Sequence, residues 1–231
     1  MEKLSDVQVG EIVTRDFRAA EVFKNAGIDF CCGGSQSLVQ VCKEKNLDLS
    51  ALEQELESLQ DTPSNEAHRF NEFKLDFLCD YIENTHHKTV LRLLPQLVAY
   101  TQKIADVHGA HHDELIQIAT LFAQINTELL QHLRKEEEVL FPAIKEVLRS
   151  GSAEAKAVVI SEISRMKDEH EFAGGTMDRI NGLSGNYSVP ADGCSTYEVT
   201  YKLLEQFEDD LHVHVHLENN ILYPKALALS I

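Results

Sequence analysis

One pattern of metal-binding residue types occurs twice in the sequence. Residues 132–142 read HLRKEEEVLFP and residues 214–224 read HVHLENNILYP, so each copy has His, three residues, Glu, three residues, Leu, an aromatic residue and Pro. Residues four apart on an α-helix lie on one face, one turn above the other. The two copies therefore predict paired imidazole and carboxylate ligands for two metal ions: His132, Glu136, His214 and Glu218.

Two further histidines stand at matching places before the two copies. His87 precedes the first copy by nearly the same distance as His170 precedes the second. Each half then supplies one histidine from one helix and the His-x3-Glu pair from the next. Four imidazoles and two carboxylates suit first-row metals such as iron, and zinc or manganese could replace iron in a recombinant sample. The carboxylates cancel only part of the charge of two ions, so we expect an oxo or hydroxo bridge as well.

Spacing alone leaves some ligand choices open. His86 and His87 are adjacent and point about 100° apart on a helix, and the apolar positions do not choose between them. His212 and His216 form a rival pair on a different face from His214, which we expect to be exposed or to support a ligand. Two other glutamates, Glu137 and Glu138, do not share the His132 face. We expect them to be solvated or to support a ligand, and Glu137 is the better candidate for orienting one.

A second chemical feature is the vicinal pair Cys31-Cys32, followed by Gly33-Gly34. Neighbouring cysteines close a disulfide only through a strained ring, so a static bridge is not expected. Two thiols on an open turn could exchange electrons or accept soft metal ions. Cys31 and Cys32 are therefore candidates for redox chemistry or iron transfer. The remaining cysteines are expected to be ordinary buried thiols: Cys42, Cys79 and Cys194.

Composition narrows the class of partner. The chain has 231 residues, 43% of them hydrophobic, and a formal net charge of −17. That charge argues against nucleic acid or an anionic membrane as a partner. No apolar stretch is long enough to cross a bilayer, and we see no signal peptide at the N-terminus. Five cysteines without a secretory signal suggest a reducing cytoplasm. Oligomeric state, monomer or homodimer, stays open.

The pattern of apolar residues predicts an all-α protein. Short helices are expected in a small N-terminal domain over residues 1–60, including one that begins at Ser50 with a capping box. A polar linker follows at 61–66. Long helices over 67–231 then predict an antiparallel four-helix bundle. Pro142 lies inside one of them and should kink it.

These motifs resemble one family in their order and combination. The chain looks like the iron–sulfur cluster repair di-iron proteins, also called regulators of iron or repair of iron centres, over essentially its whole length. The motifs that carry the resemblance are DFCCGG at 29–34, HHKTVLRLLPQL at 86–97, VHG at 107–109, HLRKEEEVLFP at 132–142, DEHEFAG at 168–174 and DDLHVHVHLENNILYP at 209–224.

The resemblance implies a small helical domain followed by a hemerythrin-like bundle that holds two non-haem iron ions. The family places its first histidine eight residues before a proline, which selects His87 over His86. It implies the full ligand set, with both glutamates bridging the irons: His87, His132, Glu136, His170, His214 and Glu218. It also implies repair of clusters damaged by nitric oxide or peroxide.

The same resemblance suggests an iron donor or repair factor, with damaged iron–sulfur proteins as partners, rather than a conventional turnover enzyme. A di-iron binder or reductase of nitric oxide or oxygen is the alternative. A metal-free or zinc-stabilised interaction module is a further one. No nucleophile–base triad, phosphate loop or dinucleotide fingerprint occurs in the sequence, so hydrolase, kinase and dehydrogenase functions have no support.

Overall fold

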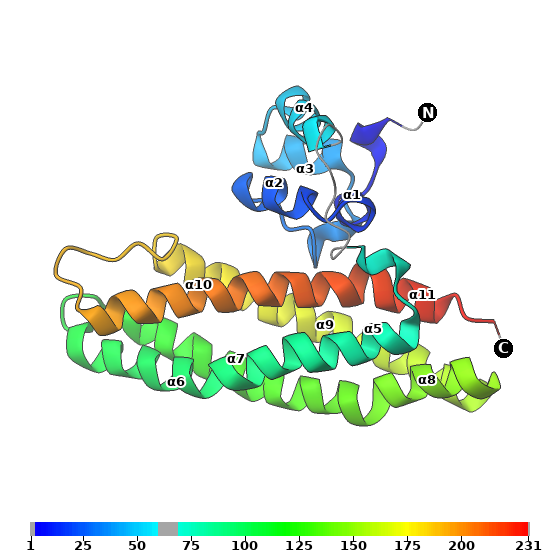
Figure 1. Cartoon of the computed structure of the whole chain (residues 1–231). Coiled ribbons are helices and arrows are strands. Elements are labelled where there is room, and N and C mark those ends of the chain that lie inside the picture. Colours follow the sequence, from blue (N-terminus) through cyan, green and yellow to red (C-terminus); the bar gives the residue numbers. More distant parts are fainter. Residues whose placement is uncertain (1–2, 60–68, 231) are drawn as a thin grey trace. The chain divides into compact units, whose positions relative to one another are not determined.

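The computed structural model describes residues 3–59 and 69–230, and helices are its regular structure (Figure 1). The predicted all-α fold is confirmed over these residues. An isolated bridge between Gln8 and Ser37 is the extended pairing found there. Among the residues described, no helix combines the length and the apolar character that crossing a membrane requires. The predicted linker at 61–66 lies outside the described residues, so the predicted domain boundaries stay predictions.

The chain forms two compact units, and the first contains Met1–Leu78 and Val215–Leu229. Its short helices bury a small apolar core that includes Val9, Phe23 and Leu38. The elements of this unit's N-terminal part are η1 (Leu4–Asp6), α1 (Val9–Arg15), α2 (Ala19–Asn25), η2 (Gly33–Ser35), α3 (Leu38–Lys45), α4 (Leu49–Ser58) and η5 (Phe70–Glu72).

One helix start in this unit differs from the prediction. The α4 helix begins at Leu49, and the side chain of Asp48 accepts hydrogen bonds from the backbone N–H groups of Ser50 and Ala51. An aspartate at this position satisfies two of the N–H groups that a helix start leaves without partners. The predicted cap at Ser50 was therefore wrong, because Asp48 reaches those groups first.

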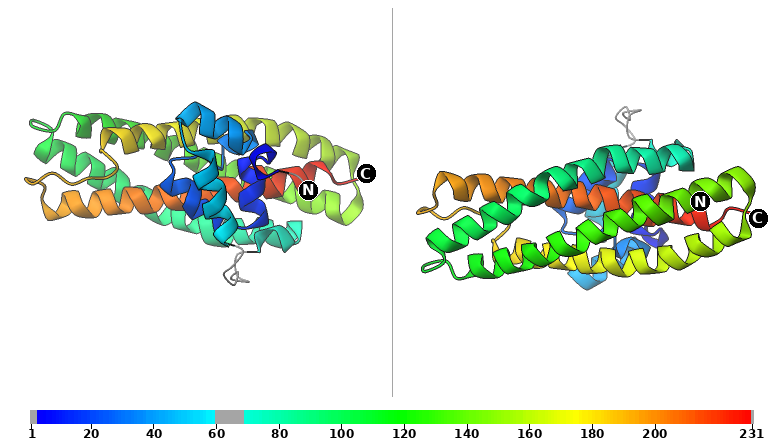
Figure 2. Two further views of the ribbon diagram at one scale, coloured as in Figure 1. Left: turned by 90° about the horizontal axis from the view of Figure 1, so that it is seen from above. Right: turned by 90° about the horizontal axis from the view of Figure 1, so that it is seen from below.

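The second unit contains Cys79–His214 with Ser230–Ile231. Its long helices run side by side in the views of Figures 1 and 2. α7 packs against α6 and α9, and α8 packs against α9. The helices of this unit are α6 (Lys88–His108), α7 (Glu114–Lys135), α8 (Phe141–Ser150) and α9 (Ala153–Leu183), together with the second half of α5 (Leu75–Ile82) and most of α10 (Ser195–His216). The short helix α11 (Tyr223–Leu227) belongs to the first unit.

Within residues 69–230, three π-helical turns interrupt the long helices where predicted ligands lie. They are η6 (Glu83–His87), η7 (Glu136–Leu140) and η8 (Leu217–Leu222). A π turn inserts one residue into a helix and commonly marks a functional site. At the position of the predicted kink, the structure has a π turn just before Pro142. Pro142 itself lies in the first turn of α8, where its missing N–H costs little.

Candidate metal centre

Two predicted ligands from different helices face each other directly. His132 on α7 and His170 on α9 place their Nε2 atoms 3.1 Å apart. The other nitrogen of His132, Nδ1, lies 2.9 Å from the Glu169 carboxylate, which can only accept a hydrogen bond, so Nδ1 carries the proton. In neutral His132, Nε2 then presents a lone pair toward His170. Two nitrogens that each lie about 2.1 Å from one metal ion, with a right angle at the ion, are about 3.0 Å apart. The observed 3.1 Å between the two Nε2 atoms is close to this value.

Glu136 lies between this pair and a second histidine group. Its Oε2 atom is 3.3 Å from His132 Nε2 and 3.4 Å from His87 Nε2. The carboxylate is fully buried. Burial alone would raise its pKa, but His132 and His87 beside it hold the pKa of Glu136 well below the usual range. A buried, ionised carboxylate is costly without a positively charged partner, and a metal ion beside these histidines would supply one.

His87 and His214 form the second group with Glu136. Their rings lie 5.0 Å apart between centroids. Ligand atoms of His87, Glu136 and His214 lie within 4.8 Å of one another, as do those of His132, Glu136 and His170. Glu218 follows His214 by one helical turn, is fully buried, and offers a carboxylate oxygen to both groups. All six predicted ligands are thus brought together.

Carboxylates hold the outer nitrogens of two of these histidines. His87 Nδ1 lies 2.8 Å from Glu137 Oε1, and His132 Nδ1 lies 2.9 Å from Glu169 Oε2. Lys135 also donates to Glu169. The hydrogen bond from His132 is the main cause that lowers the pKa of Glu169 to about 2, although partial burial opposes it. Such partners fix the tautomer and the orientation of a metal-binding imidazole.

Sequence reasoning expected Glu137 in this role but missed Glu169. Glu169 directly precedes His170 on α9 and yet supports His132 on α7, so the pair joins two helices. No spacing rule within one helix connects them. The adjacency of an acidic residue to His170 was the available signal, and it points to the wrong histidine.

The structure also separates the histidines that spacing left open. His87 joins the ligand group, whereas His86 pairs with Asp210 through Nδ1 at 3.0 Å. His212 belongs to another group, with Asp178 and Glu208. His216 is fully buried in the first unit, where its ring contacts those of Phe17 and Phe30 and burial lowers its pKa to about 4. His216 is therefore not exposed, because residues distant in the sequence cover it.

The donor set fits a pair of first-row metal ions. It combines buried imidazoles with two buried carboxylates, which are the ligand types that iron, manganese and zinc accept. Glu136 and Glu218 occur in both groups, so each group of four has two imidazoles and two carboxylates. A shared carboxylate can contact two ions at once. The arrangement can therefore hold metal and release it when its ligands exchange.

The vicinal cysteines lie in a tightly hydrogen-bonded loop of the first unit. The carboxylate of Asp29 accepts hydrogen bonds from the backbone N–H groups of Cys31, Cys32 and Gly33. The two sulfurs are 4.0 Å apart, with Cys31 buried and Cys32 half-buried. The neighbouring thiol and burial raise the pKa of Cys31 well above its usual value. Its sulfur thus stays protonated unless a metal ion displaces the proton.

The same loop is bonded to the residues that follow Glu218. The side-chain amide of Asn220 donates to the carbonyl oxygen of Phe30 at 3.0 Å, and that of Asn219 to the carbonyl oxygen of Cys31 at 3.5 Å. Gly10 and Gly34 leave room for the Asn220 side chain, since a Cβ atom at either would lie within 3.0 Å of it. The cysteine loop is therefore anchored to η8.

One of the other cysteines differs from the prediction. Cys42 and Cys79 are buried as expected, but Cys194 is exposed. It directly precedes α10, and its Sγ lies 3.2 Å from Nε2 of His108. This contact, together with backbone N–H groups at the helix start, lowers the pKa of Cys194 to about 7. The expected burial failed because the loop before α10 leaves this side chain on the surface.

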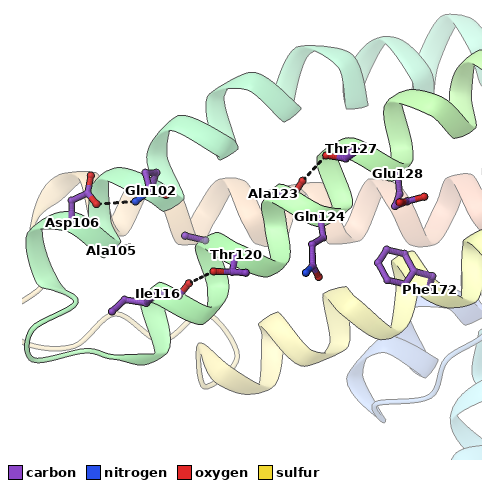
Figure 3. A pocket seen from close by; sticks show the side chains of 11 residues that line it. Gln102, Ala105, Asp106, Ile116, Thr120, Ala123, Gln124, Thr127, Glu128 and Phe172 are labelled. Carbon is purple, nitrogen blue, oxygen red and sulfur yellow. Dashed lines mark hydrogen bonds between the residues drawn. The ribbon is translucent and has the colours of Figure 1, made fainter.

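A surface groove of about 950 Å³ opens elsewhere on the long helices, between α6, α7 and α9. Figure 3 shows its polar side chains bonded along their own helices, such as Gln102 to Asp106 and Thr120 to Ile116. The predicted metal ligands do not line this groove. It is therefore separate from the centre.

Two known families match different parts of the chain. The family described as "Hemerythrin HHE cation binding domain" matches residues 80–226. A family described as a domain of unknown function matches residues 5–60.

Curated relatives match the chain over nearly their whole length. The iron–sulfur cluster repair protein ScdA of Staphylococcus epidermidis is 31% identical over 94% of this chain and 96% of its own. The iron–sulfur cluster repair protein YtfE of an Enterobacter species is 34% identical over 96% of this chain and 97% of its own. A probable iron–sulfur cluster repair protein of Haemophilus influenzae is 35% identical over 90% of this chain and 91% of its own.

Proposed function

Because the chain belongs to the family of iron–sulfur cluster repair proteins, we propose that it repairs damaged clusters with iron from its own His/carboxylate centre. Its function is iron–sulfur cluster repair, and its targets are iron–sulfur proteins that have lost or damaged their clusters. Nitrosative and oxidative stress are the conditions under which such damage arises. The stored iron is the cargo of this reaction.

We assign two non-haem iron ions to the centre. His87 and His214 would bind one ion, His132 and His170 the other, and Glu136 and Glu218 would bridge both. The observation that carries this assignment is the position of Glu136, whose Oε2 is 3.3 Å from one histidine and 3.4 Å from another. The two carboxylates neutralise only part of the positive charge of two iron ions. An oxo or hydroxo bridge would neutralise more of it.

The ligand types favour delivery of iron over permanent retention. Imidazole and carboxylate are harder ligands than the thiolates that hold an iron–sulfur cluster. Iron that leaves this centre therefore gains softer sulfur ligands at a damaged cluster. The chain would deliver its bound iron once and would then have to be reloaded. The amount of cluster repaired would therefore be limited by the amount of iron-loaded chain.

Cys31 and Cys32 are proposed to assist this transfer. With Asp29 they form a separate group of possible metal ligands, and Cys32 is partly accessible. The raised pKa of Cys31 favours metal-driven loss of its proton over spontaneous thiol exchange. None of the five cysteines, all of which lie in the described ranges, forms a disulfide. This is consistent with a reducing compartment, which we propose to be the cytoplasm.

The test is recovery of a damaged enzyme. Iron-loaded chain is incubated anaerobically with a dehydratase whose four-iron cluster has been damaged by nitric oxide, together with a sulfide source and a thiol reductant. Recovered activity should exceed that given by the same amount of free ferrous iron. Glu136→Gln protein should give no more than free iron. Equal recovery with free iron and with loaded wild-type chain would rule out the donor role.

A further inference from the structure

His86 is a buried histidine that the six-ligand centre does not use. It is 5% exposed, directly precedes His87, and its ring stacks on that of His214 with centroids 5.6 Å apart and planes 8° apart. The ring of Tyr81 also contacts it in an edge-to-face arrangement, with centroids 5.9 Å apart. His86 thus touches one proposed ligand and is the chain neighbour of another.

The partner of His86 determines which nitrogen remains available. Nδ1 lies 3.0 Å from Oδ1 of Asp210, and a carboxylate can only accept, so Nδ1 carries a proton. Nε2 of His86 and Oδ2 of Asp210 are both buried and have no hydrogen-bond partner among the described residues. In neutral His86, Nε2 therefore holds a lone pair that no described residue uses.

This is the arrangement of a metal-binding histidine. Such histidines usually donate their outer N–H to a carboxylate, as His87 does to Glu137 and His132 does to Glu169. Buried polar atoms without partners are costly and rare in folded proteins. The buried Nε2 of His86, which lacks a partner while Asp210 holds Nδ1, therefore points to a ligand that visits it.

His86 nevertheless lies outside both groups of converging ligand atoms. A resident third histidine is therefore not what the geometry indicates. Iron that leaves a centre of buried ligands must exchange them one at a time, and a ligand next to the centre lowers the cost of each exchange. A site of this kind would be occupied only during transfer.

We propose that His86, oriented by Asp210, forms a transit site through which ferrous iron passes as it enters and leaves the two-iron centre. Nε2 of His86 would bind an ion that has begun to leave His87 or His214, while Asp210 accepts a hydrogen bond from Nδ1–H and holds the ring in place. This inference rests on the proposed function, because it assumes that the centre holds iron. It adds a route to that function and two residues that no ligand pattern includes.

The experiment measures iron release from the full chain. Wild-type protein and variants are loaded anaerobically with ferrous iron, the iron per chain is measured, and release to excess ferrous chelator is followed by absorbance. His86→Phe keeps a ring that can stack on His214 but removes the ligand nitrogen. His86→Gln removes the imidazole nitrogen with a smaller change in shape, and Asp210→Asn weakens the hydrogen bond that orients the His86 ring. His111→Phe, at an exposed histidine, is the control.

We expect the His86 variants to hold as much iron as wild type but to release it at least about tenfold more slowly. Asp210→Asn should slow release less, and His111→Phe should match wild type. Unchanged release in both His86 variants would overturn the transit site. Faster release would also overturn it, because it would make His86 a support for His214. Loss of bound iron would make His86 a resident ligand and contradict the proposal.

These outcomes separate the inference from the function on which it rests. A wild-type chain that binds no iron would refute both. A wild-type chain that binds iron and restores damaged clusters, with release unaffected by His86, would leave the function standing and remove the transit site alone. If His86→Phe fails to fold, His86→Gln still decides the question, since it removes the imidazole nitrogen with a smaller change in shape.

Discussion

The backbone N–H of Phe141 donates to the carbonyl oxygen of Glu136, five residues earlier in the chain. Tyr223 makes the same bond to Glu218 in the other half of the repeat. Each bond closes a π turn that begins at or next to a glutamate shared by the two ligand groups, and each is followed by a proline. The repeated Leu-aromatic-Pro sequence thus accompanies the π turns that position the carboxylates of Glu136 and Glu218.

This relationship predicts that Pro142→Ala weakens iron binding. Pro142 cannot donate to the carbonyl of Glu138, so it prevents an ordinary α turn there. Alanine restores that donor and favours the α form, which would rotate Glu136 away from its histidines. We expect loaded protein to lose iron to a competing chelator about tenfold more readily.

Pro95→Ala is the matched control, because Pro95 lies within α6. It should leave iron retention unchanged. Equal retention by wild type, Pro142→Ala and Pro95→Ala would show that the π turn does not position Glu136.

Glu136→Gln should remove both irons rather than one. Its carboxylate is shared by the two ligand groups. A neutral amide of the same shape cannot balance the positive charge of the ions that these groups would hold. Metal analysis of anaerobically loaded protein measures the loss. Glu138→Gln changes an exposed glutamate two positions away and should bind iron normally. A Glu136→Gln chain that kept its full iron content would contradict the bridging assignment.

Glu169→Gln should lower iron affinity by about 10- to 100-fold, since Glu169 holds the outer nitrogen of His132. Competition with a chelator of known affinity gives the value. Glu171→Gln, an exposed neighbour on the same helix, is the control and should resemble wild type. The same affinity in both variants would mean that the Glu169 contact does not support the centre.

The same carboxylate predicts an acid dependence of the metal-free chain. The pKa of Glu169 is about 2 in the folded state against an ordinary value of 4.5, so the unfolded state binds more protons between those values. Its contribution to the free energy of unfolding is complete above about pH 4.5 and is lost as the pH falls toward 2. Urea unfolding at several pH values measures it.

Glu169→Gln lacks this contribution at every pH. The difference in unfolding free energy between wild type and Glu169→Gln should therefore shrink as the pH falls below about 4.5. A difference that stayed constant down to the lowest pH would contradict the lowered pKa of Glu169.

Cys194 should be the fastest thiol to alkylate at neutral pH. His108 and the start of α10 lower its pKa to about 7, so its reaction with iodoacetamide should rise with a midpoint near that pH. Mass spectrometry of the peptide that contains Cys194 gives the rate. His108→Gln should move the midpoint upward, and His111→Gln should not. A wild-type midpoint at the ordinary thiol value of about 8.5 would refute the His108 contact.

The sequence was sufficient for features that depend on position along one helix. His132 with Glu136, and His214 with Glu218, share faces because the helix repeat fixes them, and the matching offset added His87 and His170. The open choice between His86 and His87 needed the family resemblance, and the structure agrees that His87 joins the group.

Features that depend on contacts between helices were not predictable in this way. The pairing of Glu169 with His132 joins α7 to α9, and that of His86 with Asp210 joins η6 to α10. The burial of His216 depends on Phe17 and Phe30 from the N-terminal part of the chain. The π turns escaped prediction because a proline in a helix indicates a break without specifying its form.

The central claim is that iron held by this chain becomes part of a repaired cluster. The direct measurement loads the chain with isotopically enriched iron, repairs a damaged four-iron protein that contains natural iron, separates the two proteins and analyses the client by Mössbauer spectroscopy. The account predicts enriched iron within the restored cluster in proportion to recovered activity. Recovery of activity with the enriched iron still bound to the chain would contradict it.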